Sequence, residues 1–138
     1  MKKLYTLLLF LPFIASAQQN EDTKINLIPK KTDSLYWQVK YALGKCDYIV
    51  REDGNMDTLR TFAAKSPFIE GFTAIIAVIK DGKIELSGYY GLSQFDGWLF
   101  THQPNQYKPI TFFKNSKAWK QLLYIASKID CTEITYTK

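Results

Sequence analysis

The sequence predicts an α+β domain in which an antiparallel sheet of four to six strands carries two helices packed on one face. Two segments, 33–44 and 119–129, repeat apolar side chains at helical spacing, and the chain between them holds short apolar stretches divided by turn residues. Runs of strands flanked by helices are typical of α+β proteins, and each helical stripe needs a sheet to cover. The 138 residues suffice for one domain.

The first 17 residues predict an export signal. Lys2 and Lys3 precede an apolar run over 4–14, which is shorter than the roughly 20 residues that span a bilayer. Ala15 and Ala17 are small residues of the kind a signal peptidase reads. We expect cleavage after Ala17, no stable membrane anchor afterwards, and a periplasmic or secreted protein. The alternative, a retained N-terminal anchor, is disfavoured by the shortness of the run.

The charge does not favour nucleic acid as a partner. Loss of Lys2 and Lys3 lowers Lys plus Arg from 18 to 16 against 13 Asp plus Glu, so the net charge falls from +5 to +3. Nucleic-acid binders usually carry a clustered basic stripe. The one short cluster here is Lys114, Lys117 and Lys120, which we interpret as the solvated face of the second helix.

The mature chain divides into an N-terminal segment, 18–31, and a single α+β domain, 32–138. Ile25 and Leu27 in the first segment could form a short strand. The domain opens with a helix over 33–44, which Thr32 or Asp33 can cap.

The positions after this helix predict how it ends. Gly44 suits the left-handed position that often follows a helix. Tyr48 to Val50 then read as a short strand. Segment 57–64 fits either a strand or a helical turn, and the turn residues on both sides of it favour the strand.

The clearest element is a hairpin. The run 72–79 is apolar on both faces, which indicates a central strand covered on both sides. Asp81-Gly82 is a strong hairpin signal, because a type I′ turn needs positive φ at both positions. In the returning strand, 84–90, alternate residues separate into a packed face that includes Leu86 and a partly wet face that includes Tyr89.

Four further elements complete the chain. Segments 97–101 and 110–113 read as strands. The second helix begins after Asn115 or Ser116, and 133–137 reads as a last edge strand.

Cys46 and Cys131 each follow a predicted helix. Export permits a disulfide, which would tie the two helix ends and close a loop of about 85 residues. The other interpretation is two small buried hydrophobic residues, and the sequence leaves both open. A redox-active pair is disfavoured because the sequence has no C-x-x-C.

The residues that most catalytic sites need are scarce, so we expect no catalytic residue, no metal ligand set and no cofactor. His102 is the single histidine and lies in a predicted loop, without a nucleophile elbow elsewhere. Zinc needs three or four ligands at recognisable spacing. The acids Glu52, Asp53 and Asp57 cluster at a predicted turn, where Asp is expected for backbone reasons.

Aromatic residues are abundant, at 15% of the chain. Tyr89 alternates away from Leu86, and Trp98 and Phe100 alternate away from Leu99. We therefore expect Tyr89, Trp98 and Phe100 to form a partly exposed patch on the sheet face opposite the helices. Such patches usually mark a binding site.

Two motifs resemble a known family. Asp33-Ser34-Leu35-Tyr36 is similar to the opening helix, and Ala77 to Lys83 to the central strand and turn, of bacterial exported domains of unknown function with a TATA-binding-protein-like fold. The resemblance covers roughly 25–130. It implies export and that fold, and it implies no catalytic residues.

Together these observations predict a small exported, non-catalytic domain that binds a protein or small-molecule partner. One alternative is an inhibitor or immunity-type protein that blocks a partner. A second is a small hydrolase that uses carboxylates alone, which would need two carboxyl groups about 5–10 Å apart in a cleft.

Overall fold

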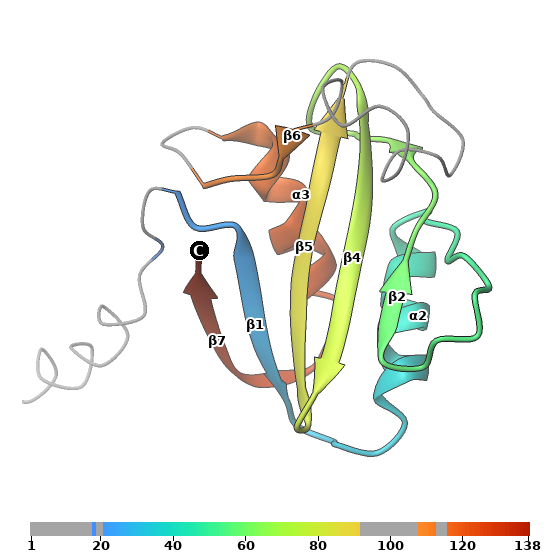
Figure 1. Ribbon diagram of the computed structural model, residues 1–138. Helices are drawn as coiled ribbons and strands as arrows, with labels where there is room; N and C mark the ends of the chain where they lie inside the picture. Colours follow the sequence, from blue (N-terminus) through green and yellow to red (C-terminus); the bar gives the residue numbers. More distant parts are fainter. Residues whose placement is uncertain (1–17, 19–20, 92–107, 113–115) are drawn as a thin grey trace, which may run out of the picture.

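The α+β architecture is confirmed by a computed structural model, which describes residues 18, 21–91, 108–112 and 116–138. Figure 1 shows the two described helices behind one antiparallel sheet. In chain order the elements are β1 (Lys24–Pro29), α2 (Leu35–Lys45), β2 (Thr58–Arg60), β3 (Ala64–Lys65), β4 (Phe72–Lys80), β5 (Lys83–Gly91), β6 (Lys108–Pro109), α3 (Lys117–Ala126) and β7 (Cys131–Thr137).

The sheet has five strands on its main path, in the order β2-β4-β5-β1-β7. The two-residue strands β3 and β6 pair with β4 and β5, which brings the total to seven. β1 lies between β5 and β7, with Leu27 opposite both Ile84 and Ile134. The strand expected near Ile25 therefore exists, and it belongs to the same sheet as the strands of 32–138.

One hydrophobic core lies between the sheet and the helices. Val39 and Leu43 of α2, and Leu122 and Ala126 of α3, are all buried in it, as the two helical stripes predict. The core face of the sheet supplies fully buried aliphatic side chains: Ile25, Leu27, Ile75, Ala77, Ile84 and Leu86. A helix stripe and a sheet face each remove the other's apolar area from water, so neither is stable alone.

The start of α2 differs from the expectation that Thr32 or Asp33 caps it. Ser34 occupies the cap position in a left-handed conformation, with φ of 57°, and its side chain makes no capping hydrogen bond. Gln38 instead reaches back from the first turn, and its Nε2 donates to the carbonyls of Lys31 at 3.0 Å and Asp33 at 2.8 Å. α3 begins as predicted, because the Ser116 hydroxyl accepts a hydrogen bond from the Trp119 amide.

The β4–β5 hairpin is confirmed in register and turn. Lys80 lies opposite Lys83, and Asp81 and Gly82 have φ of 53° and 72°, the positive values that a type I′ turn requires. Segment 57–64 is strand-like, since it contains β2 and most of the connection to β3. Among residues 48–50, only Val50 forms a β-bridge, an isolated one with Thr61. The strand expected at 48–50 is thus reduced to one bridge.

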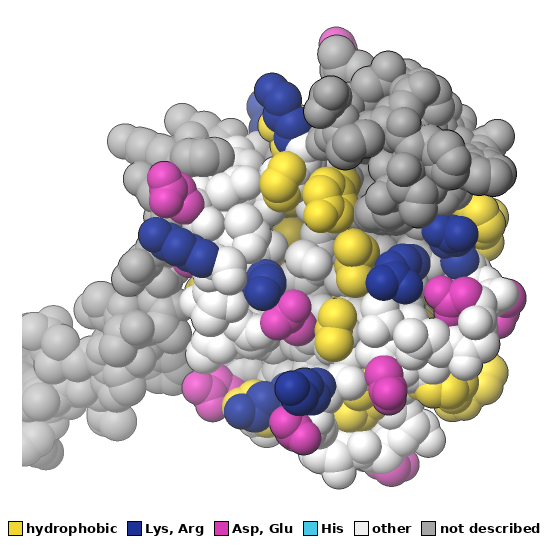
Figure 2. Space-filling model, in the orientation of Figure 1, with side chains coloured by type: hydrophobic (Ala, Val, Ile, Leu, Met, Phe, Trp, Pro, Cys, Tyr) yellow, Lys and Arg dark blue, Asp and Glu magenta, His cyan; other side chains and the backbone are white. Residues whose placement is uncertain are grey.

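The face of the sheet away from the helices is less covered than the apolar run of β4 predicts. On the helix side, three residues of β4 are fully excluded from water: Thr73, Ile75 and Ala77. On the other side Ala74 is buried, but Ile76 and Val78 are half-buried. Figure 2 views this second face and shows apolar side chains down its middle, with charged side chains around them. Among the described residues the expected cover is complete only on the helix side, because both described helices pack on that face.

Candidate functional site

A pocket of about 580 Å³ opens beside the two helices, and we refer to it as the α2–α3 pocket. Three separated parts of the chain line it: residues 45–47 at the end of α2, residues 65–68 after β3, and Gln121 and Tyr124 on α3. Small-molecule sites commonly have volumes of about 300–1,000 Å³ and combine apolar walls with a few polar groups. The lining of this pocket has that mixture.

The end of α2 is shaped by a left-handed residue that is not the predicted glycine. Gly44 lies within the helix, and Asp47 takes the left-handed conformation with φ of 66°. The amide of Asp47 donates to the Gly44 carbonyl at 3.1 Å, and that of Tyr48 donates to the Leu43 carbonyl at 3.0 Å. This is the Schellman pair of hydrogen bonds, and it fixes Cys46 and Asp47 at the wall of the pocket.

A buried amide contributes to the pocket lining. Gln121 is 1% exposed, and its Oε1 accepts a hydrogen bond from the Ser66 hydroxyl at 3.3 Å. The same hydroxyl accepts from the Phe68 amide at 3.2 Å, so one serine joins α3 to the segment after β3. A buried primary amide is costly without partners, and it offers both donor and acceptor atoms to a ligand.

An aromatic pair forms another part of the lining. The rings of Phe68 and Tyr124 meet edge to face, with centroids 5.9 Å apart. The ammonium of Lys128 lies over the Tyr124 ring, 4.7 Å from its centroid. Lys45 similarly lies over Tyr41, at 4.4 Å. Such contacts hold each lysine stem along a ring while the charge stays near water.

The two cysteines are free thiols in the structure, so the disulfide considered from the sequence is not formed. Cys46 shares the α2–α3 pocket with Gln121 and Tyr124, on the second and third turns of α3, rather than lying at the end of that helix. Cys131 begins β7 opposite Pro29.

Burial raises the pKa of both thiols above the usual range. At Cys46 the ammonium of Lys128 lowers the pKa, and the carboxylate of Asp47 raises it by less. At Cys131 the order is reversed, because the Asp130 carboxylate raises the pKa by more than Lys30 lowers it. The two thiols thus lie in fields of opposite sign.

The aromatic patch expected from the sequence can be followed only at Tyr89, since Trp98 and Phe100 lie outside the described residues. Tyr89 is on the face away from the helices, as alternation predicts, opposite Ala74. It is half-buried and packs on a small cluster of Ala63 and Ala74 with Phe72. This side chain is therefore at least partly a packing residue.

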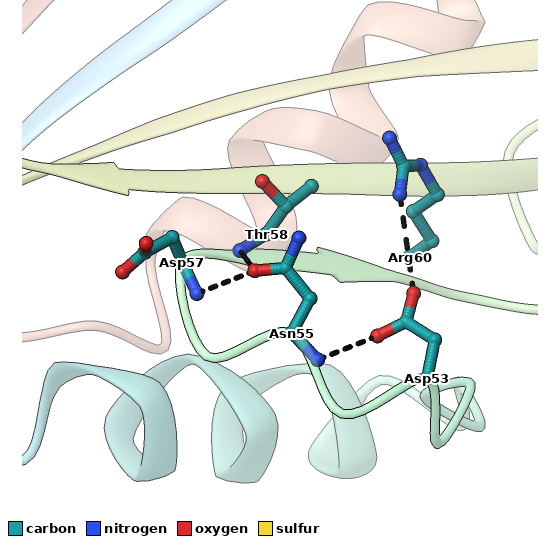
Figure 3. Close-up of polar contacts among 5 residues, drawn as sticks. All are labelled: Asp53, Asn55, Asp57, Thr58 and Arg60. Atoms are coloured by element: carbon teal, nitrogen blue, oxygen red, sulfur yellow. Dashed lines mark hydrogen bonds and ion pairs between the residues drawn. The ribbon is translucent and has the colours of Figure 1, made fainter.

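The clustered acids are engaged in local structure (Figure 3). Asp53 accepts a hydrogen bond from the Asn55 amide at 3.0 Å and lies 3.9 Å from the Arg60 guanidinium. Asn55 in turn accepts from the amides of Asp57 and Thr58.

Glu52 forms an ion pair with Lys40 at 2.7 Å, and this hydrogen bond raises the Lys40 pKa. Figure 3 shows the Asp57 carboxylate pointing away from Asp53. The arrangement stabilises the loop before β2 and does not form a facing pair of carboxylates.

Among the described residues no three or more of His, Cys, Asp and Glu gather as metal ligands, and His102 lies outside them. No helix in the described part of the chain is both long and apolar enough to cross a membrane. Comparison with protein-family models, with curated proteins and with solved structures yields no match for this chain.

The sequence analysis missed the α2–α3 pocket, although α3 carries one signal for it. Ala118, Gln121, Leu122 and Ile125 follow helical spacing and are all buried. Gln121 therefore stands as a polar residue on the buried face of an amphipathic helix. A polar residue in such a position needs a partner, and here Ser66 provides one.

Proposed function

We propose that the protein is an exported, non-catalytic binding domain whose ligand site is the α2–α3 pocket. The observation that carries the proposal is the pocket itself: about 580 Å³, with the buried Gln121 amide and the Phe68–Tyr124 ring pair in its lining. Export rests on the signal-like residues 1–17.

The rigidity of the lining supports a site for a small molecule. Residues 45–47 are fixed by the Schellman hydrogen bonds, and Ser66 bonds both the Phe68 amide and Gln121. A preformed site loses little conformational entropy when a ligand binds. The walls are therefore ordered before the ligand arrives.

A non-catalytic role is supported by what the side chains around the pocket do. The Cys46 thiol in the lining has a raised pKa, so little of the nucleophilic thiolate is present near neutral pH. Asp47 is the one carboxylate in the lining. A glycosidase-type mechanism needs a pair of carboxyl groups.

A fragment screen by ¹H–¹⁵N NMR tests the proposal. Neutral, cationic and anionic aromatic fragments are added to the mature protein. Binding at the site should shift the amides of Cys46, Phe68 and Gln121 and leave Ile76 on the opposite sheet face unchanged. The variant Pro67→Trp adds bulk at an exposed lining residue. It should raise the fragment concentration needed for half-maximal shifts at least about tenfold.

Two results would contradict the proposal. One is a screen in which no fragment moves the lining amides. The other is a set of shifts confined to β4 and β5, which would move the site to the open sheet face and restore the patch around Tyr89.

A further inference from the structure

We infer that the ligand of the α2–α3 pocket is an organic anion with an aromatic or similarly flat apolar part. The inference rests on the proposed function and specifies which chemistry the pocket selects.

Cations outnumber anions around the pocket. Lys45 and Lys65 are in the lining, and Lys128 lies over the ring of a third lining residue, Tyr124. Asp47 is the single lining acid. The lining thus holds two lysines against one acid, and a third lysine lies beside it.

The charges next to the Cys46 thiol, in the pocket wall, also favour an anion. At Cys46 the effect of the Lys128 charge on the pKa exceeds the opposite effect of Asp47. At Cys131, which lies outside the pocket, Asp130 exceeds Lys30. An anion is thus favoured at the first thiol and disfavoured at the second.

The apolar part of the ligand follows from the ring pair. Phe68 and Tyr124 meet edge to face, and both are in the pocket lining beside Pro67. Aromatic walls bind flat apolar groups by stacking or by edge contacts. The Gln121 amide and the Ser66 hydroxyl, both buried, hydrogen-bond to each other in the same lining and fix its polar part.

The two cysteines allow a direct test of the charge preference. Iodoacetate and iodoacetamide both alkylate a thiolate by displacing iodide, and they differ in charge. The ratio of their rates at one thiol removes the influence of its thiolate fraction, because both reagents use the same thiolate. We expect the ratio of the iodoacetate rate to the iodoacetamide rate to be at least about three times as large at Cys46 as at Cys131. Peptide mass spectrometry at low salt measures both rates.

Variants locate the effect. The double variant Lys65→Gln/Lys128→Gln removes the charge that lowers the Cys46 pKa, and it should lower the ratio at Cys46 towards that at Cys131. The matched control Lys80→Gln/Lys83→Gln removes two charges beside the Asp81–Gly82 turn, outside the pocket, and should leave the ratio unchanged. A ratio equal at both thiols in the unchanged protein would overturn the inference.

A pair of probes tests ligand binding itself. 3-Phenylpropanoate and its neutral amide have nearly the same shape, and the anion should bind at least about tenfold more tightly by NMR titration. Shifts should centre on Phe68 and Gln121, and the preference should shrink in high salt.

The outcomes separate the two proposals. Equal affinities for the acid and the amide at the pocket leave the binding function standing and overturn the choice of an anion. If neither probe nor any screened fragment contacts the pocket lining, the proposed function fails and the inference fails with it.

Discussion

The indole nitrogen of Trp119 donates a hydrogen bond of 3.2 Å to the side-chain oxygen of Gln18, 101 residues earlier in the chain. Trp119 is 1% exposed and packs its ring against Phe112 and Tyr136. The residue expected to be first in the mature protein is thus attached to α3. A buried indole N–H needs an acceptor, and Gln18 supplies it.

Cleavage after Ala17 would preserve this hydrogen bond, because Gln18 remains in the chain. We expect the exported protein to have the intact mass of residues 18–138, 121 residues in all. The measurement is mass spectrometry of the protein recovered outside the cytoplasm. A mass that includes residues 1–17 would refute the predicted signal.

Gly88→Ala should destabilise the protein by more than 1 kcal/mol, since overpacking a filled core typically costs about 1–3 kcal/mol. A Cβ at this position would lie 2.7 Å from the Ala74 carbonyl oxygen and 3.2 Å from the Cδ1 atoms of Ile75 and Ile110. The backbone oxygen belongs to the paired strand β4 and cannot move away. Denaturant unfolding measures the loss.

Gly44→Ala is the matched control and should change stability in the other direction. A Cβ there has no atom within 4 Å, and Gly44 lies inside α2. Replacing a helical glycine by alanine gains about 0.5–1 kcal/mol. A loss instead would show that Gly44 needs the left-handed conformation that the structure gives to Asp47.

Leu122→Ala should cost about 2–5 kcal/mol, because the side chain is fully buried between α3 and the sheet. Leu123 is adjacent and only half-buried, so Leu123→Ala should cost clearly less. Urea unfolding of both variants makes the comparison. Equal losses would contradict the orientation of α3.

Stability should fall as the pH rises above 10, with Tyr48 contributing. Burial raises the pKa of this phenol well above its ordinary value of 10.0, although its hydrogen bond with Thr73 lowers it. Above pH 10 the unfolded chain therefore loses a proton that the folded protein keeps. The stability due to this group is complete below pH 10 and declines above it, by up to about 1.4 kcal/mol per pH unit.

Tyr48→Phe should remove that part of the pH dependence while lowering stability at neutral pH, because Thr73 loses its partner. The two cysteine thiols also have raised pKa values and titrate in the same region. The variant is therefore compared with the unchanged protein at each pH. Parallel curves would exclude Tyr48 as a contributor.

The elements that local sequence specifies were predictable. The β4–β5 hairpin follows from Asp81-Gly82 and from alternation, and both signals lie within twenty residues. The end of α2 was misplaced, because Gly44 and Asp47 can both take positive φ and the sequence alone favours the glycine. A three-residue shift of this kind changes which residues face the pocket.

The α2–α3 pocket could not be predicted as a unit. Cys46, Ser66 and Gln121 come from three segments that only the packing of α2 against α3 and the sheet brings together. Their sequence separations exceed any local period. The predicted patch stays a prediction beyond Tyr89, because Trp98 and Phe100 lie outside the described residues and alternation does not say what the face of Tyr89 contacts.

The position of β1 constrains the order in which the chain can fold. β1 is among the first described residues and β7 is the last, and they pair along six positions, from Lys24 opposite Thr137 to Pro29 opposite Cys131. A polypeptide leaves the ribosome with its N-terminus first, so β1 emerges about a hundred residues before β7. Until the final strand arrives, β1 has an unpaired edge that can join another chain.

The sheet is therefore completed only after residues 131–137 have emerged. Bringing the two ends together requires closure of a long loop, which slows folding compared with a sheet built from successive hairpins. Deletion of 131–138 would leave β1 with an unpaired edge and make the shortened chain prone to aggregation.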